Sequence, residues 1–187
     1  MKKAILLLLS AISLMACCGC MYAVRYDGDY EGQVVVDDET RQPIEGVVVL
    51  GTWEVLYPDV GGGSHRYFDA KETVTDKNGD FSISGEGLRV LSNLEPMSVV
   101  IFKAGYKCVE FKWDKDAKTW HEYDRGRDRL IIRLEKLTME VRKKHDPPSP
   151  HSDSPFKKVR LMLKEIDKDS IERGLEPRGT WKRERIE

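Results

Sequence analysis

The spacing of apolar and polar residues predicts an all-β fold made of short strands. From Glu31 onward, apolar positions recur with a period of two or in short continuous runs, and Gly, Pro, Asn and Asp separate the runs. About seven such runs without an intervening amphipathic helix are typical of an antiparallel β-sandwich. The expected strands cover residues 32–36, 47–55, 72–75, 80–84, 97–103, 107–112 and 129–134.

The segment Asp76–Gly79 predicts the clearest turn in the chain. It contains Asn and Gly, which tolerate a positive φ, and it lies between two runs of strand-like composition, residues 73–75 and 81–83. We therefore expect these two runs to pair as a β-hairpin.

After Leu134 the chain becomes more charged, and residues 146–151 are rich in proline, which indicates a stiff linker. We expect the sandwich to occupy residues 30–137, and a linker, a short helix and a polar tail to occupy residues 138–187. The helix is indicated by apolar residues at spacings of three and four, namely Phe156, Val159, Met162, Leu163 and Ile166.

This helix has start and stop signals. Ser154 is placed to cap it, Pro155 to occupy its first position, and Gly174 to end it. Its many lysine and arginine residues would suit an anionic surface or a partner groove. We expect instead that the apolar stripe packs against the sandwich.

The N-terminus has the composition of an export signal. Met1–Lys3 is positively charged, and the uncharged run Ala4–Ala16 is dominated by Leu and Ile. The run is shorter than the roughly 20 apolar residues that cross a bilayer permanently. We expect residues 1–16 to be a signal peptide, followed by a tether over residues 17–29.

The end of the run, Leu14-Met15-Ala16-Cys17, resembles the bacterial lipobox. This resemblance implies a diacylglycerol on the sulfur of Cys17, cleavage before it, and often acylation of the new amino terminus. Because Cys18 and not Asp follows, it favours the outer membrane, facing the periplasm, in a Gram-negative cell. Cys18 and Cys20 are alternative acceptors, and an exported protein without lipid is a further alternative.

Cys108 stands apart from the N-terminal cysteines, in a run that predicts a strand. A buried free thiol is the simplest interpretation. A disulfide with Cys18 or Cys20 is the alternative, because an oxidising compartment permits it.

Several short motifs, in this order, resemble the carboxypeptidase regulatory-like domain. The resemblance covers residues 30–137 and implies a transthyretin-like, or prealbumin-like, sandwich that serves as an accessory or binding element without catalysis of its own. The chain departs from it in two long segments, Leu56–Ala70 and Trp113–Arg127, where the family often has shorter loops, and individual function would reside in these loops. The motifs are Gly32-x-Val34, Asp38-x-Thr40-x-x-Pro43-Ile44-x-Gly46-Val47-x-Val49, Thr75-Asp76-x-x-Gly79-x-Phe81-x-Ile83 and Lys103-Ala104-Gly105-Tyr106.

Charge argues against a nucleic-acid partner. The chain has 31 Lys and Arg against 32 Asp and Glu, a formal net charge of -1. Such a balance supplies no field that would attract a polyanion.

The sequence predicts no catalytic set, no metal site and no cofactor. The four histidines form no H-E-x-x-H motif, the arrangement in which zinc peptidases hold their metal. Ser64, His65 and Asp69 contain the residue types of a nucleophilic triad, but a triad is recognised by geometry. We therefore expect a protein that is not an enzyme.

Aromatic residues in the second long segment are the candidate binding site. Trp113, Trp120, His121 and Tyr123 lie among charged residues, and exposed aromatics of this kind stack on sugars or anchor a partner protein. The alternative is that one or two tryptophans cover the edge of the sandwich.

These features together predict a lipid-anchored cell-envelope protein that acts as a non-catalytic binding or structural module. Its expected partners are the membrane, through lipid on Cys17, and an envelope protein or saccharide. An accessory that brings an envelope enzyme to saccharide or peptidoglycan is the alternative, and a hydrolase is a weaker one.

Overall fold

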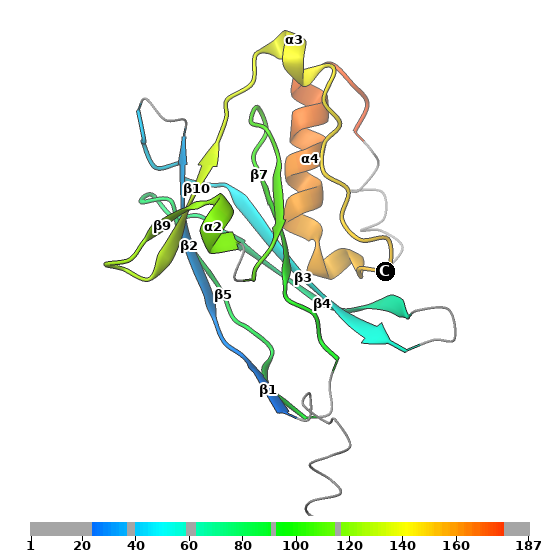
Figure 1. Cartoon of the computed structure of the whole chain (residues 1–187). Helices are drawn as coiled ribbons and strands as arrows, with labels where there is room; N and C mark the ends of the chain where they lie inside the picture. The colour runs from blue at the N-terminus through cyan, green and yellow to red at the C-terminus, as the bar shows by residue number, and fades with distance from the viewer. Residues whose placement is uncertain (1–23, 37–39, 59–62, 91–92, 115–116, 178–187) are drawn as a thin grey trace, which may run out of the picture.

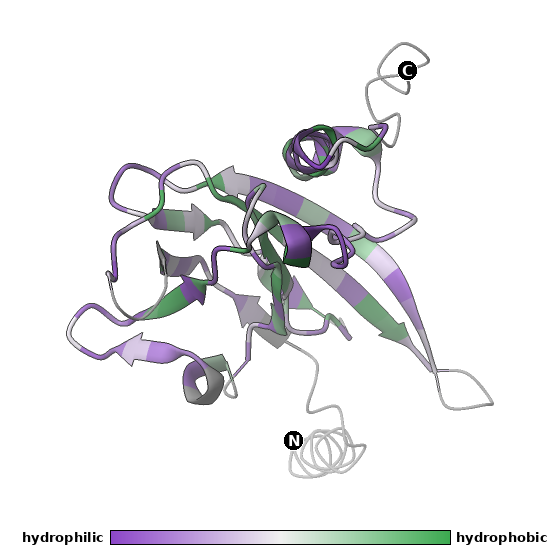
Figure 2. Cartoon of the chain, turned by 90° about the horizontal axis from the view of Figure 1, so that it is seen from above, coloured by the Kyte–Doolittle hydropathy of each residue, from purple (hydrophilic) through white to green (hydrophobic). Residues whose placement is uncertain are grey.

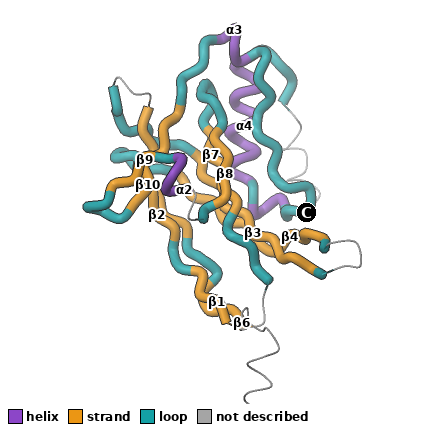
Figure 3. Tube along the Cα trace, in the orientation of Figure 1, coloured by secondary structure: helices purple, strands orange, loops and turns teal. Residues whose placement is uncertain are grey.

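Two four-stranded sheets face each other and form a β-sandwich. The computed structural model describes residues 24–36, 40–58, 63–90, 93–114 and 117–177 (Figure 1). Within them, one sheet has the strand order β5-β2-β10-β9 and the other the order β4-β3-β7-β8, and β1 and β6 form a separate ribbon (Figure 3). The all-β sandwich expected from the sequence is therefore confirmed.

The strands and helices have the following bounds. The strands are Val24–Asp27 (β1), Tyr30–Val36 (β2), Val48–Tyr57 (β3), Ser64–Val74 (β4), Asp80–Ile83 (β5), Gly87–Val90 (β6), Ser98–Phe102 (β7), Val109–Lys112 (β8), Glu122–Asp124 (β9) and Arg129–Leu134 (β10). The helices are Ala117–Trp120 (α2), Met139–Arg142 (α3), the 3-10 turn Phe156–Lys158 (η1) and Arg160–Glu172 (α4). All described strand pairs are antiparallel except β2 with β10, which is parallel.

Strand β3 is buried on both faces. Val49 and Trp53 point into the core between the two sheets, whereas Val48 and Leu50 point to the outer face of their sheet. The continuous apolar run around residue 48 reflects this two-sided burial, since a strand with one solvated face would alternate.

Helix α4 covers that outer face, so the molecule has three layers (Figure 2). Met162 and Ile166 of the helix pack against Leu50 of β3 and Phe102 of β7. The expectation that the apolar stripe of this helix packs against the sandwich is confirmed.

The predicted cap of this helix is wrong. Pro155 precedes the short turn η1, α4 begins only at Arg160, and the Ser154 hydroxyl makes no hydrogen bond in the described structure. The carboxylate of Glu72 on β4 instead accepts hydrogen bonds from the N–H groups of Leu161 and Met162, at 2.9 and 2.7 Å. A strand side chain thus satisfies the free N–H groups of the first helical turn.

The predicted hairpin around Asp76–Gly79 is also wrong, although the turn is present. Asp76 Oδ1 accepts hydrogen bonds from the N–H groups of Asn78 and Asp80, and Gly79 has φ +74°. However, β4 pairs with β3 and β5 pairs with β2, so the turn carries the chain from one sheet to the other. Local turn chemistry sets the reversal but not the partner strand.

The segment expected as a long loop over Leu56–Ala70 is mostly strand. β3 continues to Tyr57 and β4 begins at Ser64, and the two strands pair along their whole length with a bulge between Trp53 and Glu54. Strand β1 lies within the stretch expected to be a tether. The predicted signal peptide and Cys17 lie outside the described residues, and none of the described helices has the length and apolar character needed to cross a membrane.

Candidate functional site

Trp113, predicted to be exposed, is packed at the edge of the core. Its ring contacts the rings of Tyr30 and Phe81 edge-on, with centroids 5.4 and 6.2 Å apart. The side chain is half-buried against the main core. Trp113 therefore covers the edge of the sandwich, which was the alternative expected for one or two of these tryptophans.

The other three candidate binding residues lie in and after helix α2. Trp120 ends this helix, and its side chain lies outside the described structure. The His121 ring is half-buried with its centroid 4.5 Å from that of Phe111, and this burial lowers the pKa of His121. Tyr123 is half-buried, and its hydroxyl accepts a hydrogen bond from Lys118 at 3.1 Å.

An open hollow of about 300 Å³ lies beside His121 on strands β9 and β10. Glu122, Ile131 and Arg133 line it together with His121. Glu122 accepts hydrogen bonds from Arg41 at 2.9 and 3.0 Å and from Arg133. An imidazole, a carboxylate and one guanidinium around the hollow offer both the donors and the acceptors that orient a polar ligand.

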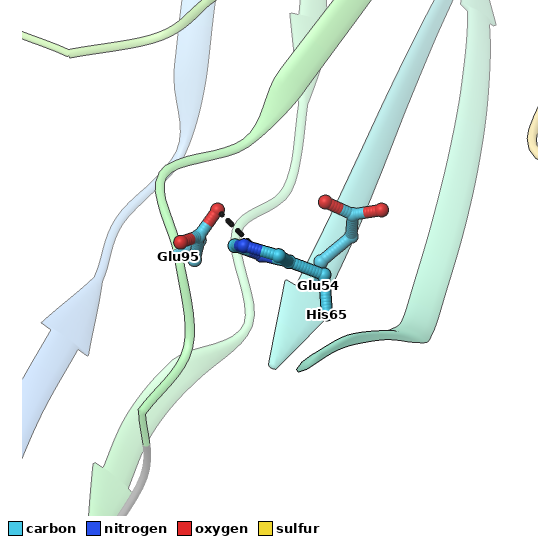
Figure 4. Close-up of side chains that lie close together, drawn as sticks. All are labelled: Glu54, His65 and Glu95. Atoms are coloured by element: carbon cyan, nitrogen blue, oxygen red, sulfur yellow. Dashed lines mark ion pairs between the residues drawn. The ribbon is translucent and has the colours of Figure 1, made fainter. Parts of the chain in front are cut away.

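A second polar cluster was not predicted from the sequence. Glu54 of β3, His65 of β4 and Glu95, just before β7, each place one possible ligand atom within 4.8 Å of the others (Figure 4). These residues are far apart in the sequence, and His65 was expected in a loop. The hairpin of β3 and β4 and the pairing of Glu95 N–H with the Glu54 carbonyl at 2.9 Å bring them together.

Each carboxylate of this cluster already has a basic partner. Glu95 Oε2 lies 2.7 Å from Lys112 Nζ and 3.4 Å from His65 Nδ1, and the hydrogen bond from Lys112 lowers the pKa of Glu95. Glu54 Oε1 lies 3.2 Å from His151 Nε2. Imidazole and carboxylate groups suit Zn²⁺, but the Lys112 ammonium competes for the Glu95 oxygen that a metal would need.

The triad of Ser64, His65 and Asp69 is not assembled. His65 pairs with Glu95, whereas Asp69 pairs with Lys158 of η1 at 3.0 Å. Asp69 does not pair with His65, and Ser64 and His65 are consecutive in β4, where successive side chains point to opposite faces, so these three residues lack the geometry of a nucleophilic triad.

Cys108 is the one cysteine among the described residues, and it is a free thiol there. Burial against the α4 layer, followed by the nearby Glu110 carboxylate, raises the pKa of Cys108 to about 12. The thiol therefore stays protonated at neutral pH, which suits a structural role. Cys17, the predicted lipid acceptor, and Cys18 and Cys20 lie outside the described residues.

No family model and no curated protein matches the chain. Among solved structures, a streptococcal ancillary pilin aligns at 15% identity and TM-score 0.32, over 60% of this chain and 30% of the pilin chain. The 3-chlorocatechol 1,2-dioxygenase of Rhodococcus opacus 1CP aligns at 15% identity and TM-score 0.33, over 60% of this chain and 61% of the enzyme.

A third solved structure, a 9R-lipoxygenase from Cyanothece PCC8801, aligns at 15% identity and TM-score 0.28, over 76% of this chain and 23% of that chain. The chain thus spans less than two thirds of the length of each of these three proteins. Their TM-scores are all below 0.5, so none of them carries an argument about family or activity.

Proposed function

We propose that this protein is a lipid-anchored, non-catalytic binding or structural module of the cell envelope. The observation that carries the proposal is the order of segments: a short positive start, an apolar run ending in Leu14–Cys17, and a β-sandwich whose first strand begins at Val24. Acyl chains on Cys17 would hold the sandwich on a membrane, since two or more buried chains anchor a protein stably. In a Gram-negative cell the expected place is the outer membrane, facing the periplasm.

We propose that the sandwich is a carboxypeptidase regulatory-like domain, because the residue types at several motif positions are the ones that the local structure requires. Gly46, Gly79 and Gly105 have φ +74°, +74° and +91°, where residues with a Cβ are strained. The Thr75 hydroxyl donates to the Ile44 carbonyl at 2.7 Å and accepts from the Val47 N–H at 2.9 Å. Two separate motif segments are thus joined by one side chain.

The non-catalytic assignment is supported by how the polar side chains are used. Asp69 is paired with Lys158, and Glu95 is paired with Lys112. A general acid, base or nucleophile needs to reach a substrate, whereas these groups hold strands and the C-terminal segment together.

Cell fractionation of Cys17→Ala beside the wild-type protein in a Gram-negative host tests the proposal. We expect the wild type in the membrane pellet and Cys17→Ala outside it or retained as an uncleaved precursor. Cys18→Ala and Cys20→Ala are matched controls and should pellet like the wild type. A wild type that is soluble after export would overturn the anchor.

The hollow on β9 and β10 favours a second candidate function, saccharide or peptidoglycan binding. The His121 ring borders a hollow that also presents Glu122 and Arg133, and sugars are bound by aromatic faces together with carboxylate and guanidinium groups. Co-sedimentation with purified peptidoglycan tests it, using Trp120→Ala and His121→Ala, with exposed Lys143→Ala, directly after α3, as the control. Loss of binding in the first two alone supports this function, and unchanged binding in all three contradicts it.

A further inference from the structure

One face of the β1–β6 ribbon is apolar and open to solvent. Tyr26, Leu88 and Val90 are 75%, 66% and 62% exposed. Tyr26 lies directly opposite Leu88 in the ribbon, and Val90 follows two residues after Leu88, so the three side chains share a face. Exposed apolar side chains grouped in this way mark a contact surface.

The opposite face fastens the ribbon to the sandwich. The buried Asp27 carboxylate accepts hydrogen bonds from Trp53 Nε1 and from the N–H of Glu86, both at 2.9 Å. The Arg89 guanidinium lies 4.1 Å from the centre of the Phe68 ring on β4. Because this side is held, the apolar side is directed away from the sandwich core.

The length of chain before the ribbon identifies what covers this face. Cys17 stands seven residues before Val24, the first residue of β1. An extended chain spans about 3.5 Å per residue, so this segment reaches at most about 25 Å. Acyl chains on Cys17, which belong to the proposed function on which this step rests, would therefore keep the ribbon close to the bilayer surface.

We infer that Tyr26, Leu88 and Val90 form a membrane-contact surface that inserts into the interface of the leaflet carrying the lipid anchor. Tyrosine is enriched at this depth because its ring is apolar and its hydroxyl is polar. The ribbon and α3 lie at opposite ends of the molecule (Figure 1). Insertion of the ribbon therefore points α3 away from the bilayer and orients the sandwich.

Site-specific labelling of the acylated full chain tests this surface. In a Cys18→Ser, Cys20→Ser background, a polarity-sensitive fluorophore is attached to Leu88→Cys or, as the matched control, to Met139→Cys on α3, where Met139 is 43% exposed. Each protein is reconstituted in phosphatidylethanolamine and phosphatidylglycerol vesicles that contain brominated lipid. We expect a blue-shifted emission and at least severalfold stronger bromine quenching at position 88 than at position 139.

Equal quenching at the two positions overturns the inference. A blue-shifted emission at position 88 without bromine quenching also overturns it, because a protein surface, such as a second copy, then covers the face. Intact mass shows independently whether the chain is acylated, so a failure of the membrane-contact surface can be told apart from a failure of the lipid anchor. If the chain carries no acyl mass, the proposed function fails, and the labelling is repeated with Cys17→Ser added, so that the Cys17 thiol takes no fluorophore. Bromine quenching at position 88 on mixing with the vesicles then still supports the surface, and its absence overturns it.

Discussion

Arg142 of α3 donates two hydrogen bonds to the Asp169 carboxylate of α4, from Nε at 3.2 Å and from Nη2 at 2.6 Å. Both side chains are buried. The N–H of Gly105, in the turn after β7, donates to the same carboxylate oxygen at 3.2 Å. One carboxylate therefore joins the sandwich, the segment that leaves it and the helix that covers it.

Loss of Asp169 should destabilise the fold strongly. In Asp169→Asn, the buried Arg142 guanidinium keeps only the exposed Glu172 carboxylate, 2.8 Å from its Nη2, and removal of one partner of a buried ion pair costs at most about 3–5 kcal/mol. Urea unfolding followed by circular dichroism measures the change. Glu140→Gln, at an exposed position in α3, is the control and should stay within about 0.5 kcal/mol of the wild type. Similar losses in both variants would contradict this account of the pair.

The contribution of Asp169 should disappear in acid. Burial by itself would raise the pKa of Asp169, but hydrogen bonds from Arg142, Gly105 and Arg173 outweigh it and hold the pKa below its ordinary value. Since the folded pKa is the lower one, the stabilisation is present above the unfolded pKa of about 3.9 and is lost as the pH falls through the folded value.

We therefore expect the difference in unfolding free energy between wild type and Asp169→Asn to be constant near neutral pH and to shrink below about pH 4. Urea titrations at a series of pH values measure this difference. A difference that grows on acidification would show that folding raises the pKa of Asp169 and does not lower it.

The packing of α4 makes a prediction about two adjacent residues. Met162 is fully buried in the layer between α4 and the sheet, whereas Leu161 is 39% exposed. Met162→Ala should lower the unfolding free energy by about 2–5 kcal/mol, because it removes buried apolar volume. Leu161→Ala, the matched control, should change it far less. Equal effects in thermal or urea unfolding would show that the helix does not use this face.

Cys108 should resist alkylation in the folded protein. With a thiol pKa of about 12, the reactive thiolate is scarce at pH 8. Peptide mass spectrometry after iodoacetamide treatment should find Cys108 unmodified in buffer and modified in urea. Modification in urea only after a reductant is added would instead indicate a disulfide with Cys18 or Cys20.

The strands with clear periodicity could be predicted from the sequence. The expected strand 129–134 has the same bounds as β10, in which every second residue, Leu130, Ile132 and Leu134, is apolar and buried. Strands β1, β6 and β9 were missed because all three are short, β1 and β6 pair with a strand that lies elsewhere in the sequence, and β9 lies within a charged segment without clear periodicity. The polar composition at the start of β4 predicts a loop, and this stretch is a strand only because it pairs with β3.

The candidate sites were harder to predict than the fold. His121 could be singled out because aromatic residues cluster near it in the sequence, but Trp113 from the same cluster is half-buried against the edge of the core. The group of Glu54, His65 and Glu95 depends on a hairpin register and on the chain segment before β7. Neither leaves a local pattern, so no sequence motif points to this group.

The intact mass of the wild-type chain, purified from a Gram-negative host, decides whether the protein has a lipid anchor. We expect a mature chain that begins at Cys17 and carries the added mass of a diacylglycerol, with or without a further acyl chain on the amino terminus. A chain without acyl mass would contradict the lipid anchor and leave an exported β-sandwich without it, whereas an acylated chain that begins at Cys18 or Cys20 would contradict only the choice of Cys17 as acceptor.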